Sequence, residues 1–198
     1  MKIILASAIA LALAAPAAAE VFNGPFVGIQ AGWNREKVSS VDSKVGALTI
    51  NESKDAFVGG VFAGYDRQVS SRIVLGAEGG FNLTTSDELT RTGRDYSGTI
   101  NPTHGFDLTA RAGYLVDPQT LIYVRGGYDN LRANVRLVNN SVVTSGHDTF
   151  DGWLVGGGIE RAIGSRISAR VEYRYSDLSS GNSSFDRHEA LVGIAYHF

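Results

Sequence analysis

The last twelve residues, Arg187–Phe198, read RHEALVGIAYHF, and this stretch decides the fold. Apolar side chains occupy every second place up to the terminal phenylalanine: Ala190, Val192, Ile194, Tyr196 and Phe198. Successive side chains of a β-strand point to opposite faces, so this alternation predicts one strand with an unbroken apolar face. The other face carries the charged Glu189 and is mixed, which indicates that the two faces meet different surroundings.

The same alternation recurs in seven segments that precede this one. They are Phe26–Arg35, Asp55–Asp66, Arg72–Leu83, Gly105–Val116, Leu121–Leu131, Phe150–Ala162 and Arg166–Asp177. Each is longer than the five or six residues that are usual for a strand in a soluble protein. Each also reaches the ~9–11 residues that a tilted strand needs to cross a membrane.

The connections between these strands alternate in length. Three are short and rich in turn residues: Arg67–Ser71, Asp117–Thr120 and Ile163–Ser165. Four are long and polar: Glu36–Lys54, Thr84–His104, Arg132–Thr149 and Leu178–Asp186. Since hairpin strands reverse direction each time, all short turns fall at one end of the sheet and all long loops at the other. This predicts an all-β protein, an eight-stranded antiparallel up-and-down transmembrane β-barrel with periplasmic turns and extracellular loops.

The two faces of the predicted strands differ in charge. The apolar parity is free of charged residues away from the strand ends, as a lipid-facing surface requires. The opposite parity interleaves glycines with charged residues: Glu78, Asp107, Arg111, Arg125, Asp129, Glu160, Arg170, Glu172, Arg174 and Glu189. Glycines in a narrow barrel leave room for long side chains to cross the interior, so we interpret this parity as a polar lumen. The alternative is a soluble, lipocalin-like barrel with the apolar face inside.

The N-terminus predicts export. Lys2 precedes a short apolar run, and Ala17–Ala19 forms an A-x-A cleavage site, which is typical of a signal peptide. We therefore expect residues 1–19 to be removed and residues 20–198 to form the barrel domain. The chain of 198 residues has no cysteine, a net charge of −2 and no basic run. These features argue against a disulfide scaffold, a cysteine-based metal site and a nucleic-acid partner.

The C-terminal residues Val192, Ile194, Tyr196 and Phe198 resemble the recognition signal that the barrel-assembly machinery reads in Gram-negative outer-membrane barrels. The stretches Phe26–Trp33, Gly60–Tyr65 and Gly152–Glu160 resemble strands of the small porin-like outer-membrane β-barrel family, which includes outer-membrane immunogenic proteins and is related to opacity-type adhesins. The resemblance covers nearly all of residues 20–198. It implies location in the cell outer membrane, contact with lipid and lipopolysaccharide, handling by periplasmic chaperones, and long loops that could bind a host or cell-surface ligand.

Two kinds of site follow from the pattern. The lumen candidates are Glu78, Arg111, Arg125, Glu160, Arg170, Glu172 and Arg174, which could form either an ion-pair gate or a closed salt-bridge plug. We expect Glu160 to face Arg170, and Arg111 to lie beside Arg125 with Glu78 as the nearest acid. Eight strands enclose an interior just wide enough for side chains to fill, which favours the plug. The four long loops are the second candidate, as a binding surface or as hydrophilic cover.

The four histidines, His104, His147, His188 and His197, show neither metal-ligand spacing nor a Ser/His/acid pattern, so no catalytic residue, metal or cofactor is predicted. The expected function is non-catalytic: envelope integrity and surface-loop interaction, as an antigen or adhesin. The alternative is a narrow porin that passes small solutes or ions through the ion-paired lumen.

Overall fold

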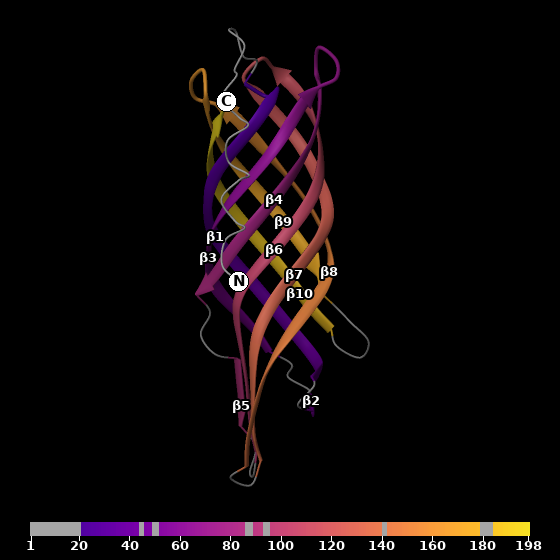
Figure 1. Cartoon of the computed structure of the whole chain (residues 1–198), viewed down its shortest axis with the longest axis vertical. Helices are drawn as coiled ribbons and strands as arrows, with labels where there is room; N and C mark the ends of the chain where they lie inside the picture. Colours follow the sequence, from indigo (N-terminus) through magenta and orange to yellow (C-terminus); the bar gives the residue numbers. More distant parts are fainter. Residues whose placement is uncertain are drawn as a thin grey trace, which may run out of the picture.

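The computed structural model describes residues 21–43, 46–48, 52–85, 89–92, 96–139, 142–178 and 184–198. The predicted signal peptide lies outside these residues. Eight long strands form the wall: β1 Gly24–Ser43, β3 Glu52–Gln68, β4 Ile73–Thr85, β6 Tyr96–Asp117, β7 Thr120–Asn139, β8 Val142–Ala162, β9 Ile167–Asp177 and β10 Ser184–His197 (Figure 1). Two short strands, β2 Gly46–Leu48 and β5 Leu89–Thr92, are added beside β1 and β6. Within the described ranges, no helix is long and apolar enough to cross a membrane.

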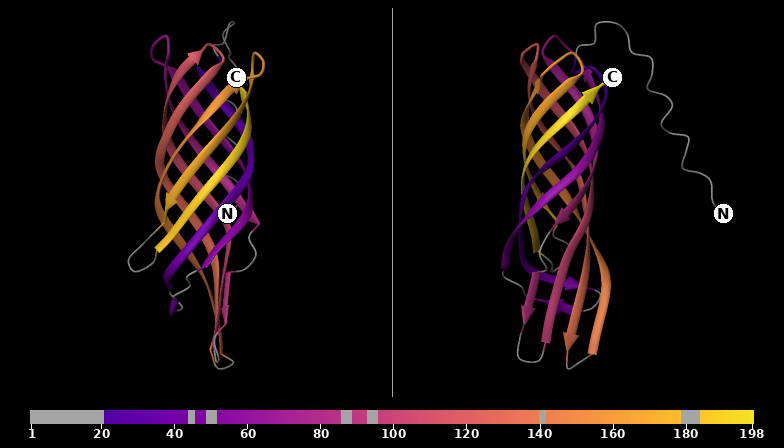
Figure 2. Two further views of the ribbon diagram at one scale, coloured as in Figure 1. Left: turned by 180° about the vertical axis from the view of Figure 1, so that it is seen from behind. Right: turned by 90° about the vertical axis from the view of Figure 1, so that its left-hand side faces the viewer.

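The sheet closes on itself. Each long strand pairs antiparallel with its neighbours in chain order, and β10 pairs with β1 from Phe26–His197 to Ser40–Ser184. This closure leaves no free edge across the barrel, which is the condition for strands to span a bilayer. Figure 2 shows the three short turns grouped with the C-terminus at one end, which we call the turn end. The opposite end is the loop end. The predicted all-β, eight-stranded barrel is confirmed.

The turns at the turn end fix the register of the hairpins. The turn between β6 and β7 consists of Pro118 and Gln119. The backbone N–H of Gln119 donates a hydrogen bond of 2.8 Å to the Asp117 carboxylate. This hydrogen bond holds the pKa of Asp117 below its ordinary value. The adjoining register places Arg111 opposite Arg125, and the turn after β8 places Glu160 opposite Arg170. Both pairings were predicted from the turn lengths.

The apolar parity faces outward. Ile29, Val61, Val124 and Val171 are each more than half exposed, and every long strand has at least one outward apolar side chain that is more than half exposed. Large aromatic side chains mark both limits of this band: Trp33, Phe57, Tyr128 and Trp153 toward the loop end, and Tyr65, Tyr114 and Tyr196 toward the turn end. The outward residues thus form an apolar belt between two aromatic girdles, as in outer-membrane barrels. This orientation excludes the soluble, lipocalin-like alternative.

The prediction that four long polar loops connect the strands at the loop end was wrong in part. Strands β6, β7 and β8 continue past the girdle, and β7 remains paired with β8 as far as Asn139 and Val142. With β5 paired to the outer part of β6, they form a sheet that projects from the loop end (Figures 1 and 2). We call this projection the arm (residues 89–92, 96–105, 129–139 and 142–152). Hairpin pairing propagates outward because the register of β7 and β8 is already fixed within the barrel.

Candidate functional site

The charged residues predicted for the lumen all lie inside the barrel. Each is at most 4% exposed, and they are Glu78, Asp107, Arg111, Arg125, Asp129, Glu160, Arg170, Glu172, Arg174 and Glu189. They are buried because consecutive inward positions on neighbouring strands bring long side chains into a narrow interior. A charge in such a place needs an opposite charge and hydrogen bonds, since it has lost its water.

Glu78 on β4 is the hub of the middle layer. Its carboxylate accepts from Arg125 of β7 at 2.7 Å, and from both terminal nitrogens of Arg170 of β9 at 2.7 and 2.9 Å. None of the three side chains is more than 2% exposed. Because β4 and β9 lie on different sides of the wall, these bonds cross the barrel axis. The guanidinium of Arg170 also lies 3.5 Å above the centre of the Phe62 ring, which adds a cation–π contact.

A second set of contacts completes this layer. Asp107 accepts from Arg125 at 2.7 Å, and Glu172 pairs with Arg174 and with the hydroxyl of Tyr123. Two amides, Gln30 and Asn82, link the charged groups through a hydrogen bond of 2.7 Å between them. Gln30, Asn82 and Tyr123 were not predicted as lumen residues. They lie on the same strand parity as the predicted charges, so the alternation would have identified them.

The layer nearer the turn end is centred on Arg111. It pairs through two nitrogens with Asp66 and donates to Glu160 at 3.0 Å, whereas its distance to Glu78 is 3.8 Å. Glu78 is therefore the acidic neighbour of Arg125, as expected, but only a secondary one for Arg111. Asp66 was missed as a lumen residue because it was placed at the last position of a strand.

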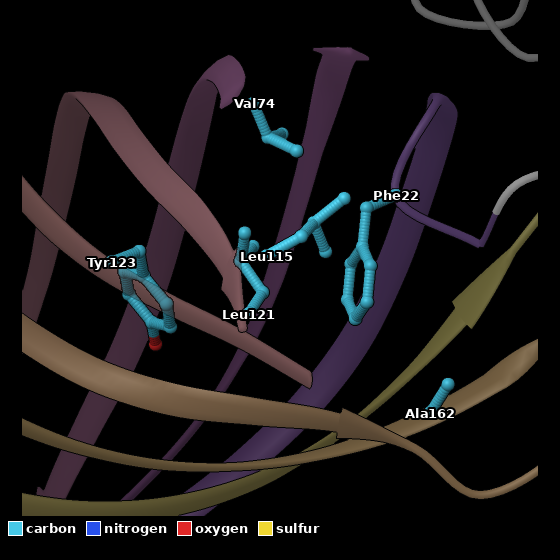
Figure 3. Packing of buried hydrophobic residues seen from close by; sticks show 6 residues of the cluster. All are labelled: Phe22, Val74, Leu115, Leu121, Tyr123 and Ala162. Atoms are coloured by element: carbon cyan, nitrogen blue, oxygen red, sulfur yellow. The ribbon is translucent and has the colours of Figure 1, made fainter. Parts of the chain in front are cut away.

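Phe22 closes this end of the lumen. Its ring packs with Val74, Leu115, Leu121, Tyr123 and Ala162, all buried, and points inward from the chain segment that leads into β1 (Figure 3). It also meets the His197 ring edge-on at a centroid distance of 5.7 Å. An apolar plug therefore lies between the charged layers and the turn end of the barrel.

Three residues next to this plug contain the groups of a hydrolytic triad but not its geometry. The Ser168 hydroxyl lies 2.5 Å from Glu160 and 2.9 Å from Nε2 of His197. Glu160 also lies 3.3 Å from that same nitrogen, while Nδ1 has no hydrogen-bond partner. In a catalytic triad the acid orients the histidine through the ring nitrogen that does not face the serine. Here Glu160 contacts the same nitrogen as Ser168, so no acid orients His197 in that way.

Glycines make room for the charged layers, as predicted. A Cβ atom on Gly80 would lie 2.3 Å from the Asp107 carboxylate, and one on Gly76 would lie 2.2 Å from that of Asp66. A Cβ atom on Gly193 would lie 3.2 Å from the Arg170 side chain and 3.2 Å from the backbone oxygen of Ile29. The long side chains thus occupy the space that other residues would fill at these positions.

The layer nearest the loop end is the least balanced. Arg187 donates to Asp129 at 2.5 Å and lies 3.6 Å from Glu189. Glu36, expected at the start of a loop, is instead buried in β1 and accepts from Asn34 at 3.3 Å. Strand β1 continues past the girdle, and Glu36 comes two residues after the inward-facing Asn34. Its side chain therefore points into the barrel as well.

The residues of the proposed assembly signal lie on the outer wall. Val192 and Ile194 are 57% and 53% exposed, and Tyr196 belongs to the girdle at the turn end. The ring of Tyr196 meets that of Phe198 at a centroid distance of 5.0 Å. These residues are therefore placed to contact lipid once the barrel is inserted.

Comparisons with known proteins agree with this architecture. Residues 3–198 match the family model described as outer membrane protein beta-barrel domain. The chain is 28% identical to a 31 kDa outer-membrane immunogenic protein of Brucella melitensis, covering 93% of this chain and 88% of the relative. It is 30% identical to a 25 kDa outer-membrane immunogenic protein of Brucella canis, covering 89% and 78%.

Another relative is outer membrane protein A of Escherichia fergusonii, at 30% identity, of which this chain spans 55% of the length. Among solved structures, Neisserial surface protein A superposes with a TM-score of 0.59 at 16% identity, covering 89% of this chain and 98% of that one. The family match spans nearly the whole sequence and agrees with the lipid-facing belt, the closed wall and the polar lumen. This chain belongs to the outer membrane β-barrel protein family and is located in the outer membrane of a Gram-negative bacterium.

Proposed function

We propose that this protein is a non-catalytic, non-conducting scaffold that supports the outer membrane and presents the arm at the cell surface. The observation that carries the proposal is the set of ion pairs across the barrel at Glu78. Arg125 and Arg170 meet this one carboxylate from different strands, and their side chains are almost wholly excluded from solvent. A layer of this kind fills the lumen at the depth where a pore would need water.

The arm supports the surface role. It is built from paired strands, so a ligand would meet a preformed surface rather than a chain that must first be ordered. Long extensions on a rigid scaffold are a common place for binding. The Brucella relatives are named as immunogenic outer-membrane proteins, which fits a protein whose outer part is accessible from outside the cell.

The proposed partners follow from the surfaces. The apolar belt and its aromatic girdles suit lipid and lipopolysaccharide. The outward row that ends at Phe198 suits the barrel-assembly machinery and periplasmic chaperones. The arm suits a ligand on a host cell or a neighbouring bacterium.

A shortened arm tests the surface role. Residues 135–146 would be replaced by Asn-Gly, which is compatible with a tight two-residue hairpin turn. The pair Asn134–His147 would then close the hairpin without changing the register below it. We expect an unchanged heat-modifiable gel shift, because the barrel is intact, together with loss of adhesion to host cells or of bacterial aggregation. Adhesion at the wild-type level in the folded variant would refute the surface role.

A narrow porin is the second candidate. The observation in its favour is that charged side chains line the lumen at every depth, from Arg187 to Arg111, whereas a purely structural core is usually apolar. In that case the ion pairs at Glu78 would open and close, and the single-channel conductance of the wild-type protein in a planar bilayer distinguishes the two functions.

A further inference from the structure

The buried charges divide into three layers of different balance. In the middle layer, three carboxylates (Glu78, Asp107 and Glu172) meet three arginines (Arg125, Arg170 and Arg174). In the layer nearest the loop end, three carboxylates (Glu36, Asp129 and Glu189) share one arginine at their own depth, Arg187. We call this group the outer acidic layer. Glu189 also faces Arg174 across β9 and β10, but Arg174 is already paired with Glu172. With its three carboxylates ionised, the outer acidic layer therefore has a formal charge of −2 in a buried place.

The strand register brings these side chains together. Glu36 is paired with Arg187, and Asn34 with Glu189, across β1 and β10. On the other side of β10, Arg187 is paired with Ser176 of β9. Asp129 reaches Arg187 from β7. Inward positions at one depth on β1, β9 and β10 thus form one polar surface, which Asp129 of β7 reaches from beyond β8, where the inward neighbour of Ser176 is the buried Leu154.

Two side-chain oxygens on this surface have no hydrogen-bond partner within the protein. They belong to Asn34 and Ser176, which are both 0% exposed. One carboxylate oxygen of Glu189 also lacks a hydrogen bond, but it lies 3.6 Å from Nε of Arg187, which itself has none, so these two atoms form an ion pair. A buried polar atom without a hydrogen bond costs free energy, so the oxygens of Asn34 and Ser176 indicate that another group satisfies them.

We propose that the outer acidic layer binds one hydrated divalent cation, of the class of Ca²⁺ or Mg²⁺. Such hard cations take carboxylate, amide and water oxygens, which are the groups that this surface offers. A charge of +2 matches the excess of two carboxylates. Within the described ranges, no three acidic or histidine side chains converge on a direct metal site, so part of the hydration shell stays in place. Its water molecules would bridge the cation to Asn34 and Ser176.

Calorimetric titration of the detergent-extracted protein at pH 7.5 with CaCl2, and separately with MgCl2, tests the proposal. We expect saturable binding of one ion, at least tenfold weaker in the Glu189→Gln and Glu36→Gln variants. Asp55→Asn is the matched control. It removes one negative charge from an exposed pair with Arg35 on the outer wall, and it should leave the affinity unchanged. If a carboxylate variant does not give the heat-modifiable gel shift, Ser176→Ala removes one acceptor without a change of charge and should weaken binding at least threefold.

Three results would overturn the proposal. The first is no binding at 10 mM of either cation. The second is binding that the three lumen variants leave unchanged, which would place the ion on the arm or the lipid. The third is a melting temperature that, with no cation bound, rises when the pH is lowered from 8 to 5 in the wild type but does not rise in Glu36→Gln. In that case protons on the carboxylates that face Arg187 and Arg174 would balance the charge.

Discussion

Replacing Glu78 with alanine should destabilise the barrel more than any other single change to a lumen carboxylate. The substitution removes the acceptor that Arg125 and Arg170 share. Arg125 keeps Asp107 at 2.7 Å and Glu172 at 3.2 Å, so it remains paired. Among the described residues, Glu78 is the only carboxylate within 4 Å of Arg170, whose remaining contacts are the Gln30 amide at 2.9 Å and the Phe62 ring.

The expected cost follows from that stranded charge. Breaking a buried ion pair by removal of one partner costs about 3–5 kcal/mol, because the other charge stays buried without compensation. Removing both partners should restore part of the loss, so the double variant Glu78→Ala/Arg170→Ala should be more stable than the sum of the two single changes predicts. The coupling energy should then be about 2 kcal/mol or more, within the range found for residues in contact.

Equilibrium unfolding in urea, with the protein in lipid vesicles, measures these free energies through tryptophan fluorescence. Asp55→Ala, which breaks the exposed pair with Arg35, serves as a control and should change the midpoint far less. A loss below about 1 kcal/mol for Glu78→Ala, with no coupling to Arg170, would refute the reasoning. It would mean that water reaches the middle layer and screens the charges as it does at a surface.

Three further predictions concern packing and assembly. Gly80→Ala should cost about 1–3 kcal/mol by the same urea assay, because a methyl group there meets the Asp107 carboxylate. Gly164→Ala, with nothing within 4 Å of the added methyl group, should leave the stability unchanged. Equal stability of the two variants would contradict this prediction. Phe22→Ala should cost about 3 kcal/mol through loss of the apolar plug, and an unchanged urea midpoint would show that the plug does not contribute to stability. Deletion of Phe198 should lower the amount of folded barrel in the outer membrane without changing the amount exported, as immunoblots of fractionated cells would reveal; a normal yield would argue against the assembly signal.

The wall of the barrel could be predicted because its physics is local. A lipid-facing strand must alternate apolar and polar residues, and a two- to four-residue turn fixes the facing pairs, so Glu160–Arg170 and Arg111–Arg125 followed from counting. The contacts across the lumen could not be counted in this way. Whether Arg111 meets Asp66 or Glu78 depends on strand tilt and stagger, which place residues from distant parts of the chain at one depth.

The errors occurred where alternation gives no signal. Polar residues beyond the girdle look like loop whether or not they continue a paired hairpin, and so the arm was missed. Phe22 precedes the first strand and has no periodic neighbours, so nothing in the pattern places its ring inside the barrel. The inward aromatic residues Phe62 and Tyr123 were overlooked for a different reason: the alternation places them inward, but aromatic side chains were expected on the lipid face.

Single-channel conductance in a planar bilayer tests the closed lumen most directly. The sample is the detergent-extracted protein, with folding confirmed by the heat-modifiable gel shift. The ion pairs at Glu78 and the plug at Phe22 predict a silent bilayer for the wild type, and also for Phe22→Ala, because the middle charged layer remains. Stable, ion-selective openings of the wild type that change in Glu78→Gln or Arg125→Ala would contradict the account and make the charged lumen a conduction path.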